Sequence, residues 1–160
     1  MSSNRRKSFT SPPLFHYRNG VIQGMTKSIL LVDDELGFSE LLQFRLQDCG
    51  YKILSATNGA EALNQARQHL PDVILLDLLL PDWDGLTLCE LLRRQPSTCD
   101  TPVIMVSAVA TEVTRHSATV AGACAYFTKP LDFDGLKAKL QSVFAAPAPH
   151  LGDDAPCMCG

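Results

Sequence analysis

The chain has 160 residues, of which 46% are hydrophobic and 19% charged, and its formal net charge is -3. A chain of this length and composition forms one domain of ordinary size, which excludes wholesale disorder. The mildly negative charge gives no reason to expect direct binding of nucleic acid. The longest apolar run, from Val73 to Leu80, is interrupted by Asp77 and is shorter than the roughly 20 residues that span a bilayer, so no membrane insertion is expected.

The first 26 residues form a separate compositional segment. Residues 1–26 carry serine, proline, asparagine and glycine with scattered basic side chains and no sustained apolar period. This predicts a flexible basic extension, with a transit peptide and a basic arm on an acidic surface as the alternatives. The basic residues precede no continuous apolar stretch, so a secretory signal is not indicated. We expect the folded unit over 27–145, with Met1 and Met25 both open as the start.

From Ser28 onward, short apolar runs alternate five times with stretches of helical period, as in a βα repeat. The strands are predicted, in chain order, at 28–32, 51–56, 73–77, 103–107 and 124–128. Gly50 is a natural stop for the first helix, and Asn58 is a good N-cap for the second. The helices are predicted at 36–48, 58–70, 86–94, 111–120 and 132–144. Beyond Ala145 the period is lost, so 146–160 is expected to be a flexible tail.

Polar residues stand at the ends of the predicted strands. Continuous apolar strands between helices predict a parallel, doubly wound α/β sheet covered on both faces, whose site lies beyond the carboxyl ends of the strands. Asp33 and Asp34 follow the first strand, and Asp77 ends the third. Ser107 ends the fourth strand, and Lys129 follows the fifth. All five groups are therefore expected to meet at one edge of the sheet.

The three aspartates of this group indicate a magnesium site. Clustered carboxylates repel one another unless a cation neutralises them, and Mg²⁺ takes hard oxygen ligands together with a phosphate. For Asp33 or Asp34 alone, a helix cap or a turn residue is the competing interpretation. Asp77 differs, because a charge inside an apolar run is costly to bury without a partner. The cluster therefore predicts phosphate chemistry.

Four motifs together resemble the receiver domains of two-component response regulators, including stand-alone, chemotaxis-regulator-like receivers, over about 27–145. The motifs are LVDDE at 31–35, LLDLLLPDWDG at 75–85, VIMVSA at 103–108 and YFTKP at 126–130. The resemblance implies a five-stranded sheet of the flavodoxin-like order 2-1-3-4-5, with helices on both faces. Two residues depart from the family pattern, Ala125 where an acidic residue is common and Leu80 where methionine is frequent.

The resemblance implies roles for four residues around the metal. Asp77 is expected to be the phosphoacceptor and Asp34 a direct ligand of Mg²⁺. Asp33 is expected to be an outer-shell or partial ligand. The backbone carbonyl of Leu79 would complete the protein's share of the ligands.

Four further residues match positions of the family that sense the phosphoryl group. Ser107 is expected to donate a hydrogen bond to it, and Lys129 to pair with its charge. The bond between Lys129 and Pro130 is expected to be cis. Tyr126 occupies the position of the switch aromatic, and it would turn inward as Ser107 moves. Simple packing is the alternative for this tyrosine.

By the same resemblance the chain is a regulatory phosphoacceptor and not an enzyme. Its donor would be a sensor histidine kinase or a phosphotransfer protein. Its output would reach a downstream protein target through the fourth helix, the fifth strand and the fifth helix. We expect a cytoplasmic, stand-alone receiver, monomeric or weakly dimeric when phosphorylated. The alternative is a scaffold with the same fold that works without phosphorylation.

Other phosphate-binding classes fit the sequence less well. A flavodoxin-like cofactor site needs a loop rich in serine, threonine and glycine after the first strand, where this chain has acids. A haloacid dehalogenase type of phosphohydrolase needs a second aspartate at the position of Leu79. The sequence also lacks the GxxxxGK[ST] motif of P-loop enzymes.

Leu79 and Val109 are expected to tune the lifetime of the phosphorylated state. Both would flank the path of the attacking water, and neither side chain can orient a water by hydrogen bonding. Slow self-dephosphorylation is therefore predicted.

The cysteines are irregularly spaced. Cys49, Cys89 and Cys124 fall in apolar segments, which favours reduced thiols in a reducing compartment. Cys157, Cys159 and His150 lack the ligand spacing of a zinc module, so an unstructured end is the preferred interpretation.

Overall fold

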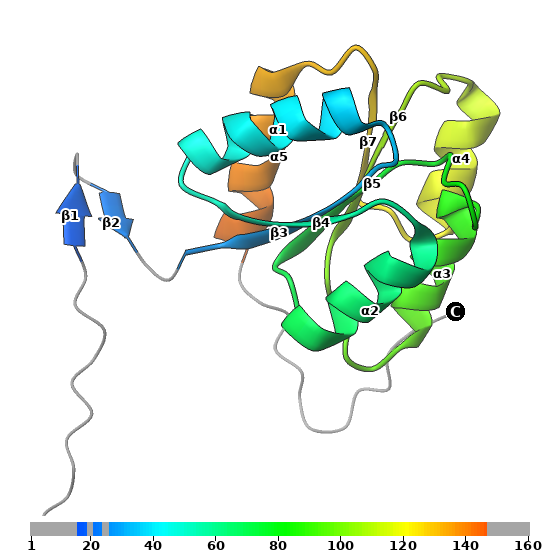
Figure 1. Ribbon diagram of the computed structural model, residues 1–160, viewed down its shortest axis with the longest axis horizontal. Coiled ribbons are helices and arrows are strands. Elements are labelled where there is room, and N and C mark those ends of the chain that lie inside the picture. Colours follow the sequence, from blue (N-terminus) through cyan, green and yellow to red (C-terminus); the bar gives the residue numbers. More distant parts are fainter. Residues whose placement is uncertain (1–15, 19–20, 24–25, 147–160) are drawn as a thin grey trace, which may run out of the picture.

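The computed structural model describes residues 16–18, 21–23 and 26–146. Five parallel strands form the main sheet in the order β4-β3-β5-β6-β7, which is the predicted order 2-1-3-4-5 (Figure 1). The strands are β3 (Ser28–Val32), β4 (Lys52–Ala56), β5 (Val73–Leu76), β6 (Val103–Ser107) and β7 (Ala125–Thr128). β3 and β6 have the predicted bounds, and each of the others is shorter by one residue at one end.

Helices follow each strand of the main sheet, also close to the predicted bounds. The helices are α1 (Leu36–Asp48), α2 (Gly59–His69), α3 (Gly85–Arg94), α4 (Glu112–Val120) and α5 (Phe133–Ala145). The side chain of Asn58 caps α2 as predicted, by accepting a hydrogen bond from the amide of Glu61. Gly50 follows α1 with a φ of 92°, a left-handed conformation that glycine adopts without a steric cost.

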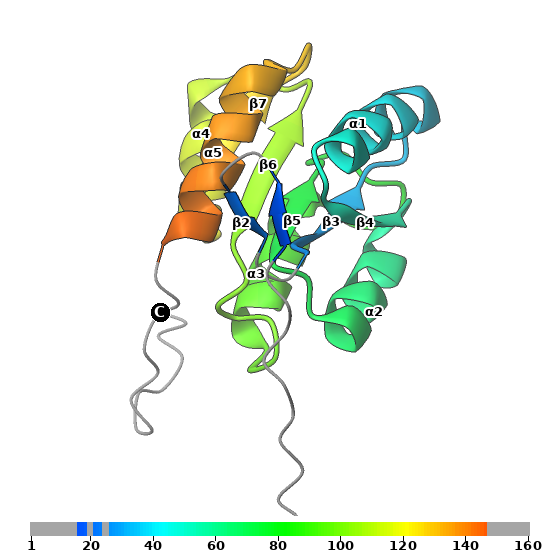
Figure 2. The ribbon, with the colours of Figure 1, turned by 90° about the vertical axis from the view of Figure 1, so that its left-hand side faces the viewer.

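The sheet carries one apolar core on each face, because successive strand residues point to opposite sides. Ile29 and Leu31 of β3 pack with α1 and α5, whereas Leu30 and Val32 pack with α2, α3 and α4. Figure 1 shows α1 and α5 together on one side of the sheet, and Figure 2 shows α1 and α2 on either side of its β4 edge. This is the predicted doubly wound architecture, and it leaves the carboxyl ends of the strands uncovered for a site.

An antiparallel pair of strands lies in the segment that was predicted to be a flexible extension. β1 (His16–Arg18) pairs with β2 (Val21–Gln23), with Tyr17 opposite Ile22. The sequence between them is Asn-Gly, a dipeptide that favours two-residue hairpin turns, and this is the signal that points to a hairpin. The predicted absence of folded elements therefore does not hold at these two strands. The remainder of 1–25 lies outside the described residues, as do 147–160 with His150, Cys157 and Cys159.

The described part of the chain bears on the cysteines and on possible membrane spans. Cys49, Cys89 and Cys124 are free thiols, but only Cys89 is buried, so the other two do not act as core hydrophobes. Burial raises the pKa of the Cys89 thiol to about 11, which makes it a poor nucleophile at neutral pH. Within the described ranges, no helix combines the length and the apolar character needed to cross a bilayer.

Candidate functional site

Three aspartates meet at the carboxyl ends of β3 and β5. The carboxylates of Asp33, Asp34 and Asp77 each offer an oxygen atom, and these three atoms lie within 4.8 Å of one another. Asp33 and Asp77 are buried, whereas Asp34 is exposed. The two strands are direct neighbours in the sheet, and for this reason aspartates 44 residues apart come together, as the strand pattern predicts.

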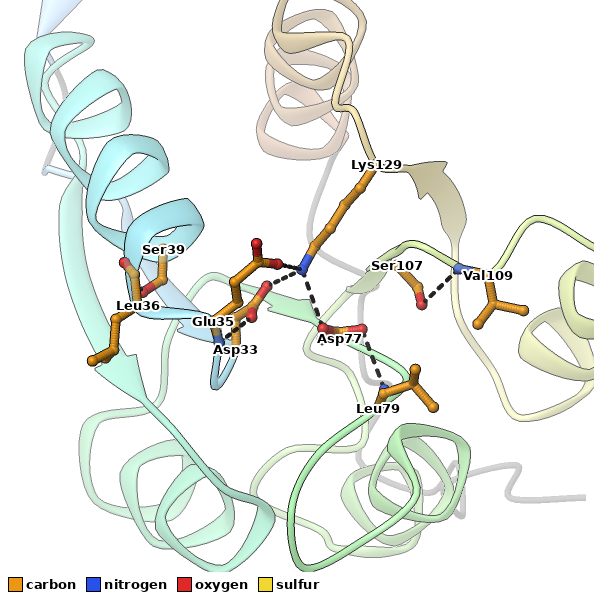
Figure 3. A network of polar contacts seen from close by, with 9 residues as sticks. All are labelled: Asp33, Glu35, Leu36, Ser39, Asp77, Leu79, Ser107, Val109 and Lys129. Atoms are coloured by element: carbon orange, nitrogen blue, oxygen red, sulfur yellow. Dashed lines mark hydrogen bonds and ion pairs between the residues drawn. The ribbon is translucent and has the colours of Figure 1, made fainter.

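Lys129 reaches the same cluster from the loop after β7 (Figure 3). Its ammonium nitrogen lies 2.7 Å from Oδ2 of Asp33 and 3.2 Å from Oδ2 of Asp77. The peptide bond between Lys129 and Pro130 is cis, as the family resemblance implied. The lysine therefore joins the ends of β3 and β5 and partly offsets the repulsion between their carboxylates.

Backbone amides hold the second oxygen of each buried aspartate. Oδ1 of Asp33 accepts a hydrogen bond from the amide of Glu35 at 2.8 Å. Oδ1 of Asp77 accepts one from the amide of Leu79 at 3.2 Å. Each carboxylate is thus fixed by one amide and one ammonium, which gives both side chains a defined orientation.

The electrostatics of the site favour the arrival of a cation. Burial raises the pKa of the Asp33 carboxyl above its usual value, although Lys129 and the Glu35 amide act in the opposite direction. Burial lowers the pKa of Lys129, but the carboxylates of Asp33, Asp77 and Glu35 together outweigh this effect, and its pKa is raised. The lysine therefore stays charged at neutral pH, while the cluster still contains more acids than bases.

The donor set fits a magnesium ion. All three groups are carboxylates, which are hard oxygen ligands, and exposed Asp34 leaves one side of the cluster accessible from solvent. The two buried aspartates each use one oxygen for Lys129, so a cation bound there would share these carboxylates with the ammonium. The side chain of Leu79 is exposed, and its amide binds Asp77.

The remaining predicted residues lie beside the cluster and are bonded elsewhere. Ser107 is fully buried, and its hydroxyl accepts a hydrogen bond from the amide of Val109 at 3.3 Å. The Tyr126 hydroxyl donates to the carbonyl of Val109 at 2.6 Å. Arg115 of α4 lies over the Tyr126 ring, 5.1 Å from its centroid. Serine and tyrosine therefore both bind one residue of the β6–α4 loop.

Sequence reasoning missed two contacts of Lys129. Its ammonium lies 3.2 Å from Oε2 of Glu35, which is mostly exposed, and 4.2 Å from the centroid of the Phe38 ring. A cation above an aromatic ring is attracted by the ring's quadrupole. Glu35 stands within the LVDDE motif, so its acidity was a usable signal. Phe38 reads as a core residue of an amphipathic helix, and nothing in its spacing points to the lysine.

The sequence model of the response regulator receiver domain matches residues 29–141. The chain is 36% identical over 135 residues to the alkaline phosphatase synthesis transcriptional regulatory protein PhoP of Bacillus subtilis. This alignment covers 81% of this chain and 55% of PhoP. It is also 36% identical over 115 residues to the DNA-binding dual master transcriptional regulator RpaA of Synechocystis. That alignment covers 72% of this chain and 48% of RpaA. The chain thus spans about half the length of these relatives.

Solved structures give the same result for the fold. A putative response regulator from Chloroflexus aurantiacus aligns with a TM-score of 0.72 at 34% identity, over 76% of this chain and 99% of that one. The chemotaxis response regulator CheY4 of Vibrio cholerae aligns with a TM-score of 0.69 at 29% identity, over 74% of this chain and 98% of its own. Together with the match over 29–141 and the acidic cluster at the strand ends, these likenesses show that the chain belongs to the response regulator receiver domain family.

Proposed function

We propose that this receiver domain is a phosphorylation-dependent switch that accepts a phosphoryl group on Asp77 from a phosphohistidine donor. The observation that carries the proposal is the position of Lys129, whose ammonium lies between Asp33 and Asp77, with an oxygen of Asp34 within 4.8 Å of both carboxylates. An acceptor carboxylate, a fixed cation and a cluster of hard ligands are the groups that phosphoryl transfer requires. A sensor histidine kinase or a phosphotransfer protein would supply the phosphoryl group.

The chemistry follows from the positions of these groups. A carboxylate oxygen of Asp77 attacks phosphorus, the P–N bond of the phosphohistidine breaks, and the imidazole leaves as the acyl phosphate forms. Lys129, 3.2 Å from the acceptor carboxylate, offsets negative charge that builds on the phosphoryl oxygens. Mg²⁺, when bound, supplies Lewis acidity and neutralises charge on those oxygens. We assign Asp34 as a direct ligand, Asp33 as an outer-shell or partial ligand, and Asp77 and the Leu79 carbonyl as the other protein ligands.

Output is proposed to pass through the β6–α4 loop. Ser107 and Tyr126 both bind the backbone of Val109. If Ser107 moves toward the phosphoryl group to donate a hydrogen bond to it, the loop loses one of these two contacts. Tyr126 then turns inward, and the surface of α4, β7 and α5 changes. A downstream protein recognises that surface.

The wider setting of the switch is also a proposal. The curated relatives are named as transcriptional regulators, and RpaA as a DNA-binding one, and both extend beyond the matched part. For this chain we propose contacts with proteins and none with nucleic acid, in the cytoplasm, as a monomer or a weak dimer linked to phosphorylation. A scaffold that works without phosphorylation is the alternative, although the ion pair between Lys129 and the buried Asp77 favours the switch.

Acetyl phosphate, a small-molecule donor, tests the proposal without a cognate kinase. The full chain and an Asp77→Ala variant are incubated with acetyl phosphate and Mg²⁺ and analysed by intact-mass spectrometry. We expect the parent to gain one phosphoryl group that hydroxylamine removes, as it does from an acyl phosphate, and the variant to gain none. Equal incorporation in both proteins, or none in the parent with Mg²⁺ present, would contradict the assignment.

A further inference from the structure

Asp82, in the β5–α3 loop, binds the N-terminus of a neighbouring helix. Its carboxylate accepts hydrogen bonds from the amide of Gly59 at 2.7 Å and from the amide of Ala60 at 3.0 Å. Both amides belong to the first turn of α2, where backbone donors have no partner within the helix and the helix dipole favours an anion. These bonds, chiefly the one from Gly59, hold the pKa of the Asp82 carboxyl below its usual value. The anion therefore persists wherever the protein is folded near neutral pH.

Trp83, the next residue, packs on the same turn of α2. A Cβ atom added at Gly59 would lie 2.8 Å from Cε3 of the Trp83 ring. Glycine is thus required here by the close approach of the indole and not by its backbone conformation. The polar contact of Asp82 and the apolar contact of Trp83 therefore join the β5–α3 loop to the first turn of α2. More than 20 residues separate this loop from that turn in the sequence.

The other end of the loop is closed against the sheet. The amide of Gly85 donates to the carbonyl of Leu78 at 2.8 Å, and Leu79 pairs with Asp84 in an isolated antiparallel bridge. A Cβ atom at Gly85 would overlap the carbonyl oxygen of Asp77, so the backbones of the loop's two ends are in tight contact. Leu79 therefore lies in a short loop with two fixed points, the end of β5 and the N-terminus of α2.

We infer that Asp82 is a positioning residue for the magnesium site, because it fixes the loop to α2 and thereby places the backbone of Leu79. The inference rests on the proposed function, in which the Leu79 carbonyl is a ligand. Asp82 contacts neither the ligand cluster nor the reacting atoms and acts through the loop. Helix α2 contributes no residue to the cluster, but by holding the loop it affects the affinity of the site for the metal.

The competing interpretation is that Asp82 is only a helix cap, and the chain offers a matched control for it. Asn58 caps the same turn, because its side-chain oxygen accepts a hydrogen bond from the amide of Glu61 at 2.8 Å. Asn58→Ala removes a cap from α2 but leaves the contacts of Asp82 and Trp83 in place. A cap that acts only on helix stability would make Asn58→Ala and Asp82→Ala equivalent.

Isothermal titration calorimetry with MgCl₂ compares the full-length parent with Asp82→Ala, Asn58→Ala and Asp34→Asn. We expect Asp82→Ala to raise the Kd for Mg²⁺ on the order of tenfold, the low end for loss of a group that orients a ligand. Asn58→Ala should stay within about twofold of the parent, since the Asn58 side chain binds the Glu61 amide, whereas the loop is held through Asp82 and Trp83. Thermal melts in chelator should show that both alanine variants lose a few degrees in Tm. Asp82→Asn, which keeps an amide oxygen as acceptor, should restore part of the affinity.

A second variant tests the same link without changing any charge. Gly59→Ala pushes the Trp83 ring away from α2, and it should also weaken Mg²⁺ binding by several-fold. If Asp82→Ala and Gly59→Ala bind Mg²⁺ as Asn58→Ala does while Asp34→Asn binds it weakly, the positioning role is wrong and the magnesium site stands. If Asp34→Asn binds Mg²⁺ as tightly as the parent, the proposed site itself is wrong, and the inference is overturned with it.

Discussion

The site has a charged half, made of Asp33, Asp77 and Lys129, and a neutral half, made of Ser107, Tyr126 and Val109. Ion pairs hold the charged half, whereas hydrogen bonds between neutral groups hold the neutral half, with Arg115 over the Tyr126 ring. Lys129 pairs with two buried carboxylates, each of which also accepts a backbone hydrogen bond. The hydroxyls of Ser107 and Tyr126 both bind the backbone of Val109. The amide of Lys129 donates to the carbonyl of Ser107 at 2.9 Å and links the two halves.

This difference indicates which part of the site can rearrange at a low cost in free energy. Breaking a buried ion pair by removing one partner costs about 3 to 5 kcal/mol, whereas a neutral hydrogen bond contributes a net of roughly 0.5 to 1.5 kcal/mol. We infer that the charged half stays in place through a signalling cycle and that the neutral half rearranges. The backbone hydrogen bond between Lys129 and Ser107 places the two halves side by side. A charge added to the charged half therefore acts electrostatically on the neutral half.

The largest expected effect is on stability, in Lys129→Met. Methionine keeps the apolar stem beside Phe38 but leaves Asp33 and Asp77 without their cation, so we expect a loss of about 3 kcal/mol in the free energy of unfolding near neutral pH. Urea denaturation in chelator measures it. Lys137→Met, at an exposed position on α5, is the control and should change little.

The pH dependence sharpens this prediction. The pKa of Lys129 is raised in the folded protein, so its stabilising charge is fully present below the usual lysine pKa and is lost only as the pH rises through the raised value. The pKa of Asp33 is already raised by burial and rises further without the lysine, so in Lys129→Met this carboxyl takes up a proton as the pH falls. The gap between parent and variant should therefore narrow in mild acid. A gap that widens there would show that the charged half is not held by these pairs.

The next effect concerns the metal. Asp34→Asn removes a carboxylate from the accessible side of the cluster, and we expect its Kd for Mg²⁺ to rise by about tenfold or more, since the charge of the ligands sets affinity for this ion. Calorimetric titration with MgCl₂ measures the change. Asp48→Asn, at the far end of α1, removes the same charge from the protein without touching the site. Equal losses in both variants would indicate a general charge effect.

Much of the fold could be predicted because each βα unit carries its own signal. The strands are buried on both faces, so they appear as continuous apolar runs, and parallel strands end at one edge, so the polar residues at their ends had to meet. The helical face was harder to assign. Leu41 and Phe44 of α1 belong to the apolar pattern but are 61% and 69% exposed, while Leu42 and Leu46, four residues apart, are buried.

Contacts between distant side chains could not be predicted from spacing. The bond between Lys129 and Glu35 joins residues 94 apart, and it depends on the direction of each side chain above the sheet. The contact of Asp82 with α2 requires the loop to fold back against that helix, and the PDWDG segment gives no sign of it. The hairpin of β1 and β2 did have a local signal, the Asn-Gly dipeptide, but the surrounding polar composition is more typical of an extension.

A smaller effect is expected on the lifetime of the phosphorylated state. Leu79 is exposed and Val109 is half-buried, one beside each half of the site, and neither can orient a water molecule. A Leu79→Asn, Val109→Glu double variant supplies polar groups at both places. We expect it to lose phosphate faster than the parent, on the order of tenfold, because a positioned water attacks in line more often. Decay is followed by mass spectrometry after the donor is removed, and equal decay rates would show that these two side chains are incidental.

The smallest expected effect tests the neutral half directly. Tyr126→Phe removes one hydrogen bond, 2.6 Å long, to the carbonyl of Val109, and that carbonyl lies in a partly exposed loop where water can replace the lost donor. The free energy of unfolding should therefore fall by no more than about 1 kcal/mol, roughly a third of the loss in Lys129→Met. Tyr51→Phe, whose ring packs on Phe144 away from the loop, is the matched control for a removed hydroxyl. Urea denaturation under one set of conditions compares all three variants. A loss in Tyr126→Phe as large as that in Lys129→Met would mean that the β6–α4 loop is held as firmly as the acidic cluster, and the loop could then not be the part that moves at low cost.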